Sequence, residues 1–109
     1  MGDLEKAQKY LHMSLRQADK FRNWGHSLLT MVGIARLFAK QGKEELALEL
    51  LVLVMSHPKS WQMGKDQAAP LVAELKAKLP PEVVVAALER GRARDLEKTV
   101  QELLVELER

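Results

Sequence analysis

The hydrophobic pattern is strongest between Leu28 and Met55, where it predicts two amphipathic helices joined by a short break at Gln41 and Gly42. On both sides of the break, apolar residues recur every three or four positions, which is the spacing of one helix face. These residues are Leu28, Val32, Ala35 and Phe38 before the break, and Leu46, Ala47, Leu50, Leu51 and Val54 after it. Gly42 suits the left-handed conformation that ends many helices. The segment is therefore predicted to be an antiparallel helical hairpin.

A further helix is expected before this hairpin, from about Leu4 to Phe21, with Asp3 as its N-cap. Its apolar stripe consists of Leu4, Ala7, Leu11, Leu15 and Ala18, widened by Tyr10 and Phe21. A break is expected over 23–25, so that the hairpin begins near His26. The second hairpin helix is apolar nearly all round, which is typical of a helix covered on several sides. We therefore expect that helix at the centre of the domain.

After the hairpin, Ser60 is a candidate N-cap for a helix over about 61–79. Pro70 lies inside this helix, where it removes one backbone hydrogen bond and costs about 3 kcal/mol. The pattern favours a helix that kinks near 66–70. The alternative is a helix that begins late, with 61–65 as a loop.

The C-terminal part predicts two more helices. Pro80 and Pro81 end one helix and begin the next, because proline is favoured in a first helical turn. The valine triplet 83–85 suits a strand by propensity, but no partner strand exists, so a short buried helix closed by Gly91 is expected. Asp95 is the expected cap of a last helix. Its narrow apolar seam is formed by Leu96, Val100, Leu103 and Leu107.

Composition agrees with one helical domain. The chain has 109 residues, of which 47% are hydrophobic and 29% charged, enough for a core and a solvated surface. Without cysteine, disulfides and thiolate metal sites are excluded. The longest apolar stretch, 46–55, is far below the roughly 20 residues of a membrane span, and no signal peptide is expected. The cytoplasm is therefore the expected location.

The charge pattern argues against two classes of partner. Seventeen basic residues are interleaved with fifteen acidic ones, for a net charge of +2, whereas nucleic-acid binders concentrate basic residues in a patch. We therefore expect no nucleic-acid partner and no membrane partner.

The chain contains an internal repeat of about forty residues. A shift by forty aligns Gly2 with Gly42, Ala7 with Ala47, and Leu11 with Leu51. Within 31–47 the sequence resembles a tetratricopeptide repeat. That family has small residues where Ala35 and Ala47 stand, an aromatic residue where Phe38 stands, and the turn glycine at Gly42. The spacing exceeds the usual thirty-four and resembles the longer repeats typical of bacterial STAND-class signalling ATPases and large LuxR-type regulators.

The segments 56–62, 79–84 and 89–97 are also similar to the far C-terminal end of such proteins. The resemblance implies an all-α, right-handed superhelix of helical hairpins, with about five helices and a C-terminal closing helix. The single domain, 1–109, would comprise the second helix of a truncated repeat (2–22), a complete hairpin (26–58), a degenerate second hairpin (60–94) and the closing helix (95–108). An upstream ATPase or effector domain is implied. Because the first helix lacks its repeat partner, we expect part of its stripe to be uncovered and to support a homodimer.

No motif for catalysis is present. The three histidines, His12, His26 and His57, lack metal-ligand spacing, and no nucleophile motif or phosphate loop occurs. We therefore expect no catalytic residues, no metal, no cofactor and no enzymatic activity. Trp24 and Trp61 at helix junctions are interpreted as packing between repeats, with a partner anchor as the alternative.

The basic turn formed by Arg90, Arg92 and Arg94 is interpreted as a favourable charge near a helix C-terminus, with phosphate binding as the alternative.

The tetratricopeptide resemblance implies that Val32, Arg36 and Lys40 face the concave groove, one turn apart. Their alternative role is a solvated helix face. The residues expected to define the repeat structurally are Ala7, Ala35, Phe38, Gly42, Ala47 and Leu51. The first hypothesis is a protein- or peptide-binding sensor or scaffold module of a bacterial STAND-type signalling protein. The alternative hypothesis is a structural C-terminal cap of the solenoid, without a ligand of its own.

Overall fold

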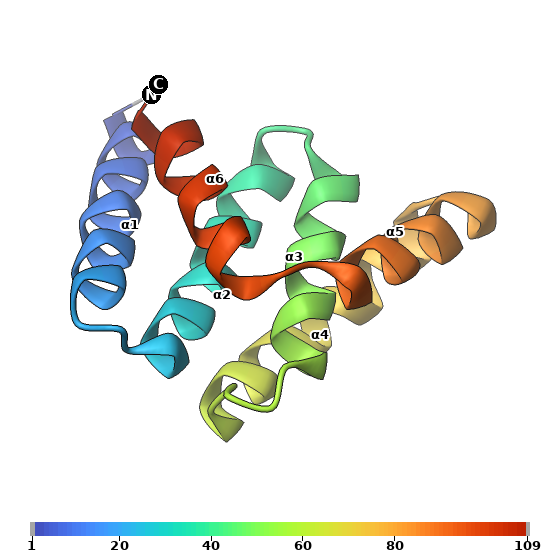
Figure 1. Cartoon of the computed structure of the whole chain (residues 1–109). Helices are drawn as coiled ribbons and strands as arrows, with labels where there is room; N and C mark the ends of the chain where they lie inside the picture. Colours follow the sequence, from blue (N-terminus) through green and yellow to red (C-terminus); the bar gives the residue numbers. More distant parts are fainter. Residues whose placement is uncertain (1, 109) are drawn as a thin grey trace.

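The structure is a computed structural model that describes residues 2–108, and within this range it contains six helices and no strand (Figure 1). The helices are α1 (Gly2–Lys20), α2 (Trp24–Lys40), α3 (Glu44–Ser56), α4 (Gln62–Lys78), α5 (Pro81–Ala93) and α6 (Leu96–Glu108). The predicted all-α class is therefore confirmed. The valine triplet belongs to the short helix α5, as expected from the lack of a partner strand.

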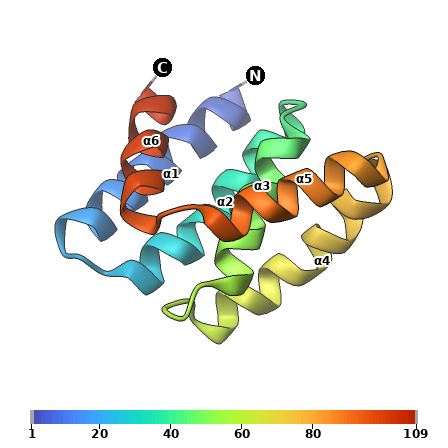
Figure 2. The same ribbon diagram turned by 45° about the vertical axis from the view of Figure 1, so that its right-hand side comes forward.

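Helix α3 lies at the centre of the molecule, where the hydrophobic pattern placed it. It packs against α2, α4 and α5, and its side chains are buried without interruption from Ala47 to Val54 (Figure 2). The core consists mainly of the inward faces of α2 and α3. Each of the largest buried side chains there, such as Phe38 and Leu48, is at most 2% exposed. The hairpin α2–α3 is thus the scaffold on which the other helices rest.

The turns on either side of α2 follow local chemistry. Gly42 has a φ angle of +84°, the left-handed conformation expected after α2. At the other end, the Asn23 side chain accepts a hydrogen bond from the His26 backbone N–H at 3.1 Å and caps α2. Trp24 and Gly25 therefore belong to α2, and the break expected over 23–25 is confined to its first residue.

Several predicted helix ends are wrong. Asp3 lies inside the first turn of α1, which already begins at Gly2. Ser60 makes no N-cap bond, because its hydroxyl donates to the Val54 carbonyl oxygen, and Trp61 precedes α4 instead. The late start of α4 is also wrong, since the helix begins at Gln62 and continues through Pro70. Two predictions hold: Pro81 begins α5, and the Asp95 carboxylate accepts a hydrogen bond from the Lys98 backbone N–H.

Gly91 does not end a helix, contrary to prediction. It lies within α5, is buried, and faces α3. A Cβ atom added at this position would lie 2.6 Å from Val52 Cβ and 2.7 Å from the Glu49 carbonyl oxygen. Real Cβ atoms almost never come so close to other heavy atoms. The glycine is therefore required by the close approach of α5 to α3.

The last helix, α6, returns to pack against the first helix, α1 (Figure 1). The Gln8 side chain donates to the Leu107 carbonyl oxygen at 2.7 Å, and Gln101 donates to the Asp19 carboxylate at 3.2 Å. In an open solenoid, each unit contacts only its sequence neighbours. Here the first and last helices are in contact, so α6, the predicted closing helix, packs on α1.

This contact changes the expectation for α1. Leu15 and Ala18 of the apolar stripe are buried, whereas Leu4, Tyr10 and Phe21 remain 37%, 69% and 69% exposed. Part of the stripe is thus exposed, as expected, but the part formed by Leu15 and Ala18 is buried. Self-association through this helix remains a prediction.

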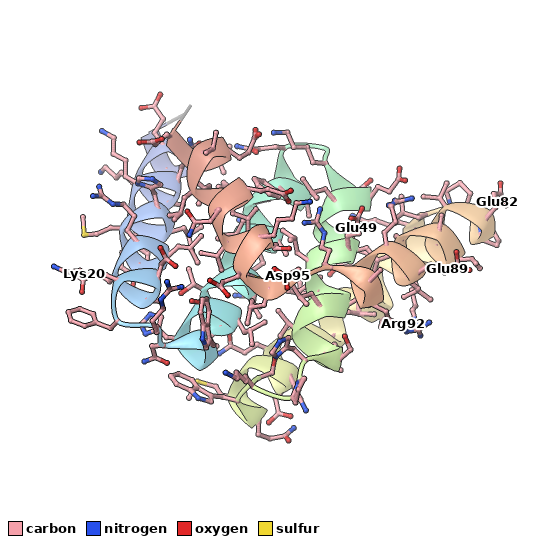
Figure 3. All side chains as sticks on the ribbon, viewed as in Figure 1. Lys20, Glu49, Glu82, Glu89, Arg92 and Asp95 are labelled. Atoms are coloured by element: carbon pink, nitrogen blue, oxygen red, sulfur yellow. The ribbon has the colours of Figure 1, made fainter. Side chains whose placement is uncertain are left out.

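An ionic cluster holds the α5–α6 junction on α3. Glu49 of α3 is only 8% exposed and accepts hydrogen bonds from Arg90 Nε at 2.9 Å and Arg94 Nε at 3.0 Å (Figure 3 labels Glu49). Arg94 also donates to Thr99 and Glu102 of α6. Two arginines of the basic turn therefore have a structural role, because their guanidinium groups join α3, α5 and α6.

Candidate partner-binding face

The three residues expected to line the groove do not share one environment. Arg36 and Lys40 are exposed on α2, one turn apart, but Val32 is completely buried. The prediction for Val32 is wrong because α2 packs against α1, α3 and α4, and Val32 lies on the same stripe as Leu28. A buried valine cannot contact a partner.

The first groove runs between α2 and α4 and has a volume of about 300 Å³. Arg36 and Lys40 line it from α2, while Glu74 and Lys78 line it from α4. Its apolar lining is provided by Ala35, Ala39, Leu51, Leu71 and Leu75. The groove therefore combines an apolar floor with a mainly basic rim.

A second groove lies between α1 and α2 and has a volume of about 250 Å³. Arg36 and Lys40 line this groove as well, which makes them the shared wall between the two hollows. The other residues that line it are Leu4, Ala7, Tyr10, Leu11, Gly33 and Leu37. Two cations thus form a ridge with an apolar groove on either side. We call the ridge and its two grooves the α2 face.

The ridge cations are available for an external anion. Among residues 2–108, neither Arg36 nor Lys40 has an ion-pair or hydrogen-bond partner for its side chain. Other cations of the chain, such as Arg22 and Lys43, pair with carboxylates of α6. The α2 face therefore carries two cations without an ion-pair partner among residues 2–108, and apolar surface lies beside them.

Most of the repeat-defining residues belong to the hydrophobic core. Four of them, Ala35, Phe38, Ala47 and Leu51, are at most 2% exposed, and Ala7 is half-buried. Ala35, Leu51 and Ala7 nevertheless contribute to the floors of the two grooves. Sequence reasoning did not identify the residues of α4 that complete the first groove, because no short-range signal relates α4 to α2.

The two tryptophans pack at the helix junctions. Trp61 lies against Gly25, where an added Cβ would come within 2.1 Å of the indole Nε1, and it is 44% exposed. Its ring centroid is 6.3 Å from that of His26. Trp24 is half-buried and lies under the Arg22 guanidinium at 5.5 Å. Both side chains thus join neighbouring elements, in the manner interpreted from the sequence.

In the part of the chain that the structure describes, no group of three or more histidines, aspartates and glutamates is arranged to hold a metal ion. Burial lowers the pKa of His57, with a further lowering by the nearby Lys59. None of the helices described is both long enough and apolar enough to cross a membrane.

Comparison with protein-family models, with curated proteins and with solved structures finds no match to this chain. The resemblance to tetratricopeptide repeats therefore rests on the motifs of the sequence alone.

Proposed function

We propose that this chain is a protein- or peptide-binding module whose α2 face holds an acidic segment of a partner. One observation carries the proposal: the side chains of Arg36 and Lys40 are exposed and unpaired, and they stand between two apolar grooves. Five other cations pair with carboxylates within the molecule: Arg22, Lys43, Lys78, Arg90 and Arg94. The ridge is instead positioned to pair with carboxylates from outside.

The chemistry of the α2 face defines the partner segment. Carboxylates over the ridge would accept charge-assisted hydrogen bonds from Arg36 and Lys40, which are about twice as strong as neutral ones. Apolar side chains on either side of those carboxylates would enter the grooves and bury their surface at roughly 25 cal/mol per Å². Glu74 on the rim of the first groove would repel a carboxylate placed there. The best ligand is therefore an amphipathic segment with its acidic residues centred on the ridge.

The resemblance to long tetratricopeptide repeats supports a larger setting for this module. By that resemblance, it would serve as a sensor or scaffold part of a bacterial, cytoplasmic signalling protein of the STAND class. In this proposal the chain binds its partner and has no catalytic activity of its own.

A second candidate function, a structural cap, is favoured by α6. This helix covers α1 and turns a polar side outward, including Gln101, Glu102 and Glu108. A polar outer face is what a terminal repeat needs for solubility. In that case the α2 face would bind nothing.

The test is selection from a displayed peptide library, followed by calorimetry with the selected peptides. We expect enrichment of segments in which aspartate or glutamate lies beside leucine or phenylalanine. The double variant Arg36→Glu with Lys40→Glu should bind them at least about tenfold more weakly, because two attractive pairs become repulsive. Its melting temperature should stay close to that of the parent, since neither side chain has a partner within residues 2–108.

The matched control is Lys65→Glu with Lys76→Glu, which changes the net charge equally but lies on α4, outside both grooves. This control should bind the selected peptides as the parent does. If no acidic peptide is selected, or if both double variants lose affinity equally, the α2 face is not a binding site and the structural cap becomes the better function.

A further inference from the structure

The outer side of α1 exposes three large apolar side chains, of which Tyr10 also lines the groove between α1 and α2. Tyr10, Met13 and Phe21 are 69%, 63% and 69% exposed. Phe21 directly follows α1, and its backbone N–H still bonds to the Gln17 carbonyl oxygen, so it continues the helical turn. At spacings of three and eight residues, these side chains lie on one side of the helix. Exposed apolar side chains gathered on one side commonly mark an interaction site.

The same side of α1 is strongly basic. Lys6, Lys9, Arg16 and Lys20 are all exposed, and none has an ion-pair partner among residues 2–108. The only carboxylate between Lys6 and Phe21 is Asp19, and it faces α6, where it accepts a hydrogen bond from Gln101. In Figure 3, Lys20 projects from the free edge of α1, on the side opposite α6.

A broad hollow of about 740 Å³ lies between α1 and α6 and borders this side. Lys9, Arg16 and Lys20 line it from α1, together with Asp19 and, across from them, Leu104 of α6. Its rim therefore presents three cations, spread over about three turns of the helix. An array of this kind attracts anionic groups spread over a surface rather than a single ion.

We propose that this outer face of α1 docks on a membrane surface that contains anionic lipid. Helices that lie in the membrane interface combine aromatic and aliphatic side chains, which enter the headgroup boundary, with lysines and arginines that bind the acidic headgroups. Tyr10, Met13 and Phe21 supply the first set, and the four cations supply the second. The helix lies along one edge of the molecule, so its full length reaches a flat surface (Figure 1).

Two other occupants fit this face less well. A second copy in a symmetric dimer would place the same four cations opposite each other, and like charges repel. Single-stranded nucleic acid stacks successive bases on aromatic rings. Here Tyr10 and Phe21 are eleven residues apart, about 16 Å along the helix, which is too far for neighbouring bases.

This inference departs from the sequence-based expectation of no membrane partner. That expectation rested on the absence of a spanning segment and on the alternation of charge along the chain. The structure separates the charges, because Glu97, Glu102 and Glu106 of α6 pair with Arg22, Arg94 and Lys43, while the cations of α1 have no ion-pair partner among residues 2–108. The proposal does not use the ridge cations Arg36 and Lys40, although Tyr10 also lines the groove between α1 and α2.

The test is co-sedimentation of the whole chain with vesicles of phosphatidylcholine, with or without phosphatidylserine. We expect binding only to the mixed vesicles, with a loss at high salt as screening increases. Each basic residue near an anionic surface strengthens binding about fivefold. The variant Lys9→Glu with Arg16→Glu should therefore lower the partition coefficient by at least about 25-fold. The control Lys65→Glu with Lys76→Glu, of equal net charge, should bind nearly as the parent does.

A second variant, Met13→Ser with Phe21→Ser, tests the apolar contribution and should weaken the binding that remains at moderate salt. The proposal is overturned if mixed vesicles do not bind the chain, or if the α1 and α4 charge variants lose binding equally. It is also overturned if a labelled single-stranded oligonucleotide binds the chain while the mixed vesicles fail to compete. Retention of peptide binding by the Lys9→Glu with Arg16→Glu variant would show that the two faces act separately.

Discussion

The close contact between α5 and α3 at Gly91 predicts both the sign and the size of the change in stability that Gly91→Ala would cause. We expect Gly91→Ala to destabilise the protein, although alanine is the better helix former. The added Cβ would meet Val52 Cβ at 2.6 Å and the Glu49 carbonyl oxygen at 2.7 Å. Both atoms belong to or adjoin the backbone of α3, so no side-chain rotation relieves the overlap. The two helices must separate.

The magnitude follows from two opposing terms. Overpacking of a well-filled contact costs about 1–3 kcal/mol, while the change from glycine to alanine in a helix contributes about 1 kcal/mol of stability. Because the overlap involves backbone, the cost lies in the upper part of its range, and the net loss is about 1–2 kcal/mol. For a domain of this size, the melting temperature should fall by about 5–10 °C.

Gly64→Ala is the matched control, because Gly64 is also a buried glycine within a helix that packs against α3. There the added Cβ would lie 3.8 Å from Leu29 Cδ1 and Val54 Cγ1, an ordinary van der Waals distance. This variant should gain up to about 1 kcal/mol. Urea unfolding followed by circular dichroism measures both changes. If Gly91→Ala proves as stable as Gly64→Ala, α5 does not approach α3 as closely as described.

Three further predictions concern the core and its ionic cluster. Ala47→Arg should unfold the domain, because Ala47 is completely buried in α3 and the new charge would have no partner; a circular-dichroism melt within a few degrees of the parent would show that α3 is misplaced. Glu49→Ala should lower the free energy of unfolding by about 2–3 kcal/mol, because it leaves Arg94 without its main carboxylate partner. The cost is smaller than for a fully buried ion pair, since Arg90 is half-exposed. An unchanged midpoint in urea unfolding would mean that the cluster does not anchor α6. The pKa of His57 is lowered in the folded state, so the unfolded state takes up the proton first as the pH decreases below the ordinary value of 6.5. The free energy of unfolding should therefore fall with pH until the lowered folded pKa is passed. Urea unfolding at several pH values should show that His57→Asn loses this pH dependence.

The positions of the helices could be predicted from the sequence because their signals are local. Apolar residues at three- and four-residue spacing identify the hairpin, and Gly42, Pro81 and Asp95 mark helix ends through their own backbone or side-chain chemistry. The central place of α3 could also be predicted, since a helix that is apolar all round must be covered on several sides. The cations Arg36 and Lys40 were identified through the resemblance of 31–47 to a tetratricopeptide repeat.

The tertiary structure alone decided which faces meet. Val32 has the spacing of a groove residue and of a core residue, and only the packing of α2 against three helices makes it core. Gly91 looks like a helix end until the approach of α3 shows that a side chain has no room there. In both cases the deciding contact involves residues far away in the sequence, which helical periodicity does not report.

The same reason explains the two candidate surfaces. The return of α6 to α1 depends on long-range contacts such as Gln8 with Leu107, and no local pattern indicates them. That return covers one side of α1 and pairs the carboxylates of α6, so the cations of the outer face stay unpaired. Charges that alternate along the chain therefore become separated in space. Periodicity determines which residues share a helix face. The free energy of burying helix faces against each other determines which faces stay exposed and can bind a partner.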